Sequence, residues 1–211
     1  LPAGGMMAAV FADVATVREL LPAVTQPLDA REQHGAELLV DEPEELAIAA
    51  VNGPRSTVIA GRAELVEAAL QRLADEGISG RPLATSHAFH SALMEPILDS
   101  FEETARGLPF APPQIPLVSN LTGDVLAPGA TQDARYWRRH LREPVQFYAG
   151  MQRLRALGCT LFVEIGPQPH LTAMGRRCLD ESNLAWLPSL QAGQDDWAAL
   201  LDSLGALYER G

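Results

Sequence analysis

The chain has 211 residues, a formal net charge of −11, 47% hydrophobic residues and 20% charged residues. This composition argues against a disordered chain. The negative charge argues against nucleic-acid binding, because phosphate neutralisation needs a basic face. Since no apolar run approaches the roughly 20 residues that span a bilayer, we expect no membrane insertion. The length allows one large domain or two small lobes.

The first 86 residues are predicted to form four strands and two helices. These elements are strand 6–11, helix 13–21, strands 46–52 and 56–61, helix 62–76 and an extended run at 80–85. Asp13 is the predicted cap of the first helix and Gly77 the predicted stop of the second. Residues 25–45 are predicted to be mostly loop, with a short strand at 38–40. The order strand, helix, strand, strand, helix, strand is typical of a ferredoxin-like βαββαβ subdomain, which we place at residues 1–86.

After residue 86 the pattern changes to helices that alternate with strands. The predicted elements are helix 91–107, a proline-rich connection, a hairpin at 117–126, helix 136–157 interrupted at Pro144, strand 161–165, helix 170–179, strand 185–190 and helix 197–208. Four leucines of the last helix, Leu200, Leu201, Leu204 and Leu207, are expected on one face. This alternation predicts the α/β class, with part of a layered sheet whose edges need partners.

The cysteines and the start of the chain indicate the compartment. Cys159 and Cys178 form no Cys-x-x-Cys and no metal-ligand pattern, so we expect reduced core thiols in a cytoplasmic protein. The chain begins at Leu1 without an initiator Met, and no charged segment precedes an apolar signal region. The sequence is therefore compatible with a piece of a longer protein.

The stretch from Thr85 to Glu95 carries two of the five histidines, His87 and His90, at the junction between an extended run and a helix. An imidazole titrates near neutral pH, so it can take a proton from a hydroxyl or thiol and return it later. Either histidine is a candidate general base for acyl transfer. Spacing alone nevertheless favours half-buried structural imidazoles.

A nucleophile for such a base is not evident. The G-x-S-x-G elbow that exposes a catalytic serine does not occur in the 211 residues. Ser86 and Ser91 are too close in sequence to the histidines and are expected to cap the chain locally. Neither cysteine lies beside a histidine or a basic cluster in the sequence, so a Cys-His pair is not supported.

Two other kinds of site are disfavoured. His87 and His90 would need a carboxylate or a cysteine at a recognised spacing to hold a metal, and none is present, so we expect no metal site. Arg138, Arg139 and Arg142 would suit an anionic ligand. On a helix with neighbouring glutamates such a cluster is more often a solvated face of ion pairs.

Four strings taken together resemble the acyltransferase domain of modular type I polyketide synthases. Their order and spacing also match that family, and the resemblance covers essentially the whole chain. The strings are Val51-Asn52-Gly53-Pro54-Arg55-Ser56, His87-Ala88-Phe89-His90-Ser91, Tyr136-Trp137-Arg138-Arg139-His140-Leu141-Arg142-Glu143-Pro144-Val145, and Phe162-Val163-Glu164-Ile165-Gly166-Pro167.

The resemblance implies a Ser-His transferase. Such an enzyme takes a malonyl-type group from a coenzyme A thioester onto a serine and passes it to the phosphopantetheine thiol of an acyl carrier protein, without a bound cofactor of its own. It also implies that residues 87–211 are the C-terminal part of an α/β-hydrolase-like subdomain that ends in the start of a linker. The other implied partners are the ketosynthase and linker domains of the same synthase.

The resemblance assigns roles to five residues. His90 corresponds to the family's general base, and the backbone carbonyl of His140 is expected to orient its ring. His87 and Phe89 match the signature for unsubstituted malonyl units, because a Phe ring fills space that an α-methyl group would need. Asn52 is expected to line the cleft between the lobes.

One departure from the family matters for activity. The serine elbow, the oxyanion-hole donor and the Arg that pairs with the malonyl carboxylate belong to a region that would precede Leu1. We therefore expect the chain to need the N-terminal half of the domain as a partner and to be inactive alone. A malonyl transferase of fatty acid synthesis and a non-catalytic docking or structural fragment of a synthase remain the alternatives.

Overall fold

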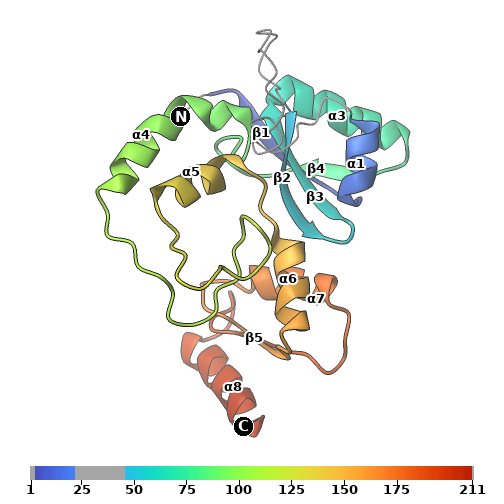
Figure 1. Cartoon of the computed structure of the whole chain (residues 1–211). Helices are drawn as coiled ribbons and strands as arrows, with labels where there is room; N and C mark the ends of the chain where they lie inside the picture. Colours follow the sequence, from blue (N-terminus) through green and yellow to red (C-terminus); the bar gives the residue numbers. More distant parts are fainter. Residues whose placement is uncertain (1–2, 22–45, 211) are drawn as a thin grey trace. The chain divides into compact units, whose positions relative to one another are not determined.

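The computed structural model describes residues 3–21 and 46–210 (Figure 1). The predicted short strand at 38–40 lies outside the described residues. The chain divides into two compact units, residues 1–150 and 151–211. The boundary predicted between residues 86 and 87 falls inside the first unit, where segments from both sides of it pack on one sheet.

A four-stranded antiparallel sheet forms the centre of the first unit. Its strands and two helices are β1 (Gly5–Val10), α1 (Val14–Leu20), β2 (Leu46–Gly53), β3 (Ser56–Arg62), α3 (Ala63–Asp75) and β4 (Gly80–Pro82). The strands lie in the order β2-β3-β1-β4, with β1 paired to β3 and β4 and with β2 paired to β3. The described residues thus confirm the predicted order of strands and helices.

Local sequence signals set the ends of these helices. The carboxylate of Asp13 accepts a hydrogen bond from the backbone N–H of Thr16 at 2.9 Å, which caps α1 as predicted. Gly77 follows α3 with a φ of +74°, a left-handed conformation that glycine adopts without steric cost. Both signals act within one turn of helix, which is why the sequence alone was sufficient to find them.

Both faces of the sheet are buried. One face packs against α1 and α3 through a cluster that includes Ala8, Val10, Val17, Ile48, Ile59, Val66 and Leu73 (Figure 1). The opposite face carries a second cluster, with Met7, Ala49, Ala50, Val58, Ala60 and Ala88 at its core and Leu83, Phe89, Leu93 and Val145 packed against it. Successive side chains of a strand point to opposite faces, so one strand serves both clusters. The second face therefore holds the histidine-bearing segment.

The rest of the first unit is mainly helical. A 3-10 turn at Ala92–Met94 leads into α4 (Glu95–Arg106), and α5 (Ala134–Arg142) is followed by α6 (Phe147–Ala156). The predicted break at Pro144 is confirmed, since Pro144 lies between α5 and α6. The helix breaks there because proline cannot donate the helical hydrogen bond. The predicted hairpin at 117–126 is reduced to one antiparallel bridge between Val118 and Val125.

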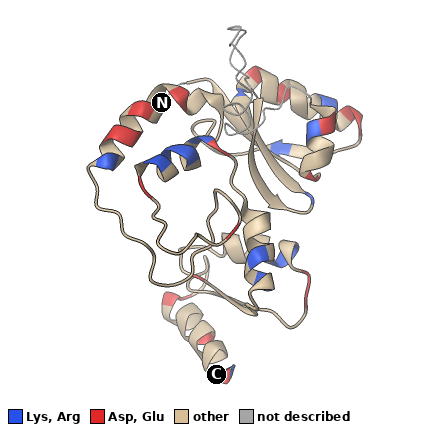
Figure 2. Ribbon diagram, viewed as in Figure 1, with Lys and Arg blue, Asp and Glu red and all other residues tan. Residues whose placement is uncertain are grey.

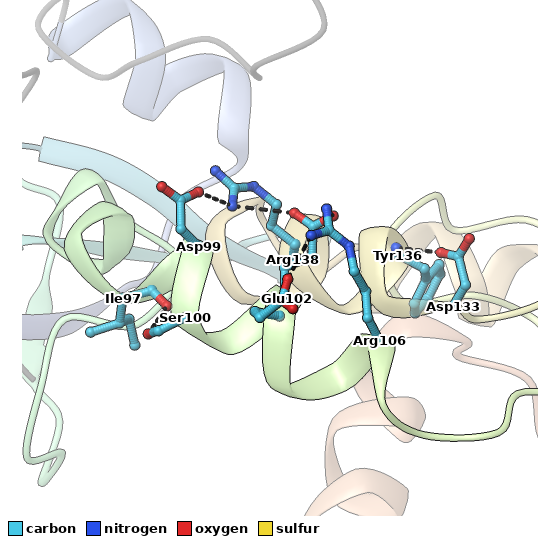
Figure 3. A network of polar contacts seen from close by, with 9 residues as sticks. Ile97, Asp99, Ser100, Glu102, Arg106, Asp133, Tyr136 and Arg138 are labelled. Carbon is cyan, nitrogen blue, oxygen red and sulfur yellow. Dashed lines mark hydrogen bonds and ion pairs between the residues drawn. The ribbon is translucent and has the colours of Figure 1, made fainter.

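Opposite charges join α4 to α5. Acidic residues line α4 and basic residues line α5 (Figure 2). Arg138 of α5 reaches Asp99 at 2.6 Å and Glu102 at 3.3 Å on α4 (Figure 3), and Arg142 reaches Glu95 at 3.1 Å. The predicted ion-paired face is confirmed, but the prediction that it is solvated is wrong for Arg142, which is buried between the helices.

The second unit contains a two-stranded parallel sheet among its described residues. β5 (Leu161–Glu164) pairs with β6 (Ala185–Pro188), and α7 (His170–Cys178) and α8 (Asp196–Glu209) follow them in turn. Phe162 and Trp186 stack across the two strands with ring centroids 4.4 Å apart. All four elements lie within a few residues of their predicted positions.

Glu164 ties β5 to α7. Its carboxylate accepts hydrogen bonds from the backbone N–H groups of Leu171 at 2.9 Å and Thr172 at 2.7 Å. Burial alone would raise the pKa of Glu164, but these hydrogen bonds at a helix N-terminus outweigh it and lower the pKa. The Phe-Val-Glu-Ile-Gly-Pro string thus has a structural role, because its glutamate caps a helix.

Helix α8 presents an apolar face to solvent in the described structure. Leu200, Leu201 and Leu204 are all exposed, as is Trp197, while Ala199 and Ser203 are the buried residues of the helix. The predicted leucine-bearing face of this helix is therefore present. Within residues 3–21 and 46–210, no helix combines the length and the apolar character needed to span a bilayer.

Gly5 offers a test of how closely the histidine-bearing segment packs on β1. A Cβ atom at this position would lie 2.8 Å from the Cβ of Ala88 and 2.9 Å from its backbone N, closer than real side chains approach. We predict that Gly5→Ala lowers the free energy of unfolding by about 1–3 kcal/mol, as overpacking does. Urea unfolding measures this difference.

Gly205 of α8 supplies the matched control, because a Cβ there meets nothing within 4 Å. Gly205→Ala should stabilise the helix by about 0.5–1 kcal/mol, the usual gain when alanine replaces glycine in a helix. Equal unfolding midpoints for Gly5→Ala and the unchanged chain would contradict the close packing.

Candidate active site

His90 has an unusual backbone conformation. Its φ of +59° is the only positive value at a non-glycine residue in the part of the chain that the structure describes. Such a conformation costs energy and persists only where the surroundings hold it. Here the hydroxyl of Ser91 donates to the carbonyl of Ala88 at 2.6 Å and accepts from the N–H of Leu93 at 3.3 Å. The capping role predicted for Ser91 is confirmed, and it encloses His90 in a tight turn.

The C-terminal end of α5 holds His90 at two points. The backbone N–H of His90 donates to the carbonyl of Leu141 at 3.3 Å, and Nδ1 lies 2.9 Å from the carbonyl oxygen of Glu143. A carbonyl only accepts, so Nδ1 carries the proton in this hydrogen bond. In the neutral ring the lone pair then lies on Nε2. This is the arrangement of a base whose ring is oriented by a third group.

The hydrogen bond of Nδ1 at 2.9 Å is accepted by the carbonyl of Glu143, three positions after His140. The orienting role of the His140 carbonyl stays a prediction, because the backbone of His140 also forms a hydrogen bond with His90. Pro144 accounts for both observations: it cannot donate to the carbonyl of His140, and it forces the residue before it into an extended conformation. Glu143 has φ −88° and ψ 158°, which turns its carbonyl out of the helix. The His140 backbone makes only a weaker contribution, which raises the pKa of His90.

The segment after α5 is fixed by the sheet. Val145 forms a parallel bridge with Ala50 of the edge strand β2: its N–H donates to Ala49 at 2.9 Å, and its carbonyl accepts from Val51 at 2.9 Å. These two bonds extend the sheet by one residue. They fix the position of Glu143, two residues earlier, beside His90. Ala88 and Phe89, which precede His90, pack on one face of this sheet.

The surroundings favour the neutral form of His90. Burial lowers the pKa of His90, because the charged ring would lose hydration. The hydrogen bond to Glu143 opposes this effect, and the charge of His140, whose ring centroid is 5.9 Å away, adds to the lowering. Burial lowers the pKa of His140 as well. His90 is therefore unprotonated at neutral pH and able to accept a proton.

The other predicted residues lie near the same face of the sheet or at its edge. Phe89 packs against the second cluster, on the face of the sheet opposite α1 and α3. Its ring meets the ring of His87 edge-on, with centroids 6.0 Å apart. Nδ1 of His87 lies 2.9 Å from the hydroxyl of Ser86. Asn52 is half-buried in β2, two residues after the one that pairs with Val145. Selectivity roles for these residues stay predictions.

A metal cluster and the cysteine thiols are the other candidates for chemistry. Across residues 3–21 and 46–210, no three His, Cys, Asp or Glu side chains lie together so that they could hold a metal ion. Cys159 and Cys178 are half-buried and form no disulfide, and burial raises the pKa of Cys178 to about 11. The thiol of Cys178 therefore stays protonated and is a poor nucleophile.

Comparison with known proteins identifies the family. Residues 12–209 match the family described as "Acyl transferase domain". The chain is 38% identical to polyketide synthase GfsA of Streptomyces halstedii and 36% identical to the phenolphthiocerol synthesis type I polyketide synthase Pks15/1 of Mycobacterium marinum. Each alignment covers 100% of this chain but only 3% and 9% of the two synthases.

Solved structures agree with this relationship. The acyltransferase domain from the second module of the salinomycin polyketide synthase is 40% identical with a TM-score of 0.85, and the match covers 100% of this chain and 45% of that one. A malonyl-CoA:acyl carrier protein transacylase of Xanthomonas oryzae is 30% identical with a TM-score of 0.74, over 96% of this chain and 59% of that one.

The chain thus spans about half the length of these structures. Its mixed α/β fold, with a four-stranded antiparallel sheet and surrounding helices, matches theirs along its whole length. The family match, the relatives and the structures agree, and the chain belongs to the acyltransferase domain family of type I polyketide synthases.

Proposed function

We propose that the chain is the base-bearing half of an acyltransferase that moves a malonyl extender unit from malonyl-coenzyme A to an acyl carrier protein. The observation that carries the proposal is the hydrogen bond from Nδ1 of His90 to the backbone carbonyl of Glu143, which leaves the lone pair of the neutral ring on Nε2. The serine nucleophile is supplied by polypeptide outside these 211 residues, because the sequence holds no G-x-S-x-G elbow.

In this mechanism His90 moves one proton in each half-reaction. Nε2 accepts the proton of the serine hydroxyl as its oxygen attacks the thioester carbonyl, and returns the proton to the departing coenzyme A thiolate. The phosphopantetheine thiol of the carrier protein then gives its proton to Nε2 and attacks the acyl-serine. The proton finally returns to the serine oxygen as that bond breaks. The reaction needs no bound cofactor.

The two parts of the chain have different roles in this proposal. The sheet of β1 to β4 with α1 and α3 is the ferredoxin-like subdomain, and the segments after residue 86 are the C-terminal part of a hydrolase-like subdomain. The βαββαβ order and the antiparallel sheet support the first assignment. The parallel pair of β5 and β6 supports the second. A carrier protein, the ketosynthase and linker domains of the synthase and the N-terminal half of this domain are the proposed partners.

A malonyl transferase of fatty acid synthesis is the second candidate, since the Xanthomonas oryzae transacylase is 30% identical. Higher identities of 36–40% to polyketide synthase sequences and to a synthase acyltransferase structure favour the polyketide type. Acceptance by a synthase carrier protein rather than a fatty-acid carrier protein would distinguish the two. A fragment with only a docking role would support neither transfer.

The need for an external nucleophile is directly testable. We predict that the 211-residue chain alone is not acylated by labelled malonyl-coenzyme A, because the base has no serine to activate. Adding the upstream half of the domain, as a separate polypeptide or fused to this chain, should produce an acyl-enzyme detectable by intact-protein mass spectrometry. Stable acylation of the chain alone would contradict the prediction.

His90 is predicted to be the base. In a protein that contains both halves, His90→Ala should slow serine acylation by about 10²–10⁴-fold, the usual cost of losing a general base. Because burial lowers the pKa of His90 below its ordinary 6.5, acylation should persist at mildly acidic pH and fall only as the pH drops through that lower pKa. Rates across the pH range measure both effects.

His170 of α7 provides the control for this experiment, because it lies in the second unit and has no proposed part in the reaction. His170→Ala should leave the rate unchanged. An acylation rate for His90→Ala equal to that of the His170 variant would remove His90 from the mechanism.

Phe89 is predicted to restrict the extender unit. Replacing it with a smaller residue, as in Phe89→Ser, should raise the acceptance of methylmalonyl relative to malonyl. The free-energy difference between the two substrates should change by a few kcal/mol at most, because one steric contact is removed. Competition between the two coenzyme A thioesters measures the ratio. Since Phe89 also packs on the sheet, a thermal melt should accompany the assay. An unchanged ratio in a folded variant would place selectivity elsewhere.

A further inference from the structure

Arg139 and Glu143 form a close ion pair within the last turn of α5. Nε of Arg139 lies 2.6 Å from Oε1 of Glu143, and Nη2 lies 3.1 Å from Oε2. The guanidinium therefore binds the carboxylate through two parallel hydrogen bonds, a geometry that fixes direction as well as distance. Only 7% of the Glu143 side chain is exposed, against 34% for Arg139. A carboxylate buried to this extent needs its partner.

The same glutamate is held by its backbone. Its N–H donates to the carbonyl of Arg139 at 2.7 Å, which closes the end of α5. Its own carbonyl accepts the hydrogen bond from Nδ1 of His90 at 2.9 Å. Arg139 thus contacts Glu143 through both its side chain and its main chain, and Glu143 in turn contacts the imidazole of His90 through its carbonyl. Arg139 therefore holds Glu143 through three hydrogen bonds, two to its carboxylate and one from its backbone N–H, next to the carbonyl that meets the imidazole.

The neighbouring arginines of α5 have different partners. Arg138 pairs with Asp99 and Glu102 of α4 (Figure 3), and Arg142 pairs with Glu95. Those ion pairs join two helices. Of these three arginines, Arg139 is the one that pairs with Glu143, the residue whose carbonyl accepts from Nδ1 of His90. The helix therefore offers an almost identical side chain, one position away, that lacks this connection.

We propose that Arg139 is a positioning residue for His90. By fixing Glu143, it keeps the carbonyl on Nδ1 and so maintains the tautomer in which Nε2 carries the lone pair. Without the ion pair the carbonyl moves, and the ring is free to adopt the tautomer with the proton on Nε2, which cannot accept another. The consequence for acyl transfer rests on the proposed function, whereas the effect on the tautomer does not.

The tautomer of His90 can be measured in the 211-residue chain itself. Histidine labelled with ¹⁵N reports the state of each ring nitrogen by NMR, and the signals that vanish in His90→Gln belong to His90. We expect a protonated Nδ1 in the unchanged chain at neutral pH. In Arg139→Met the two ring-nitrogen shifts should converge, as the second tautomer becomes populated. Arg138→Met is the matched control and should keep the shifts of the unchanged chain.

Glu143→Gln guards against a variant that fails to fold, because it removes the carboxylate charge and keeps both the size of the side chain and the backbone carbonyl. It should also shift the tautomer toward Nε2–H, and adding Arg139→Met to it should cause little further change. A protonated Nδ1 with unchanged shifts in a folded Arg139→Met or Glu143→Gln chain would overturn the proposal. An equal shift in Arg138→Met would also overturn it, by showing a general effect of the helix.

A kinetic measurement separates positioning from substrate binding. In a protein that contains both halves of the domain, Arg139→Met should lower kcat on the order of 10- to 100-fold, the usual cost of a misplaced catalytic group, with KM for malonyl-coenzyme A unchanged. A raised KM with the original kcat would mean that Arg139 binds substrate, which contradicts the proposal. If the unchanged protein transfers no acyl group, the proposed function is wrong. The tautomer measurement still tests the positioning role of Arg139 in that case, because it does not depend on acyl transfer.

Discussion

The candidate site depends on one hydrogen bond, from Nδ1 of His90 to the carbonyl of Glu143, which joins residues 53 positions apart. This bond determines which ring nitrogen is protonated, so it decides whether the imidazole acts as a base at Nε2. The positive φ of His90 and the turn held by Ser91 bring the ring to that carbonyl. The strained backbone of His90 is tolerated because packed elements on several sides hold this residue in place.

The antiparallel sheet is the scaffold for this arrangement. One face packs against α1 and α3, as a small α/β lobe requires, while the other supports Ala88 and Phe89 beside the histidine. The edge strand β2 bonds to Val145 and so fixes the segment that follows α5. His90 and the carbonyl of Glu143 therefore lie on separate chain segments that share one rigid support, which keeps their relative position constant.

The arginines of α5 show how similar side chains on one helix can serve different ends. Arg138 and Arg142 join α5 to α4, with Arg142 buried in the junction. Arg139 instead binds Glu143, which belongs to the site. A buried ion pair gains little net stability over apolar packing. The proposed role of the Arg139–Glu143 pair is therefore to fix the direction of the Glu143 carbonyl. The same helix thus joins α4 through two arginines and holds Glu143 through the third.

Features that depend on neighbouring residues can be predicted from the sequence. Short apolar runs predict the strands, Asp13 and Gly77 predict helix ends, Pro144 predicts the break after α5, and four motif strings indicate the family. Tertiary contacts decide which backbone carbonyls meet His90, that Val145 joins the sheet edge, and that Arg142 is buried. Local periodicity reports the environment of one element, whereas these features depend on how segments distant in the sequence meet. The carbonyls of His140 and Glu143 are the clearest case, because Pro144 frees the first and turns the second, and only packing brings His90 to them.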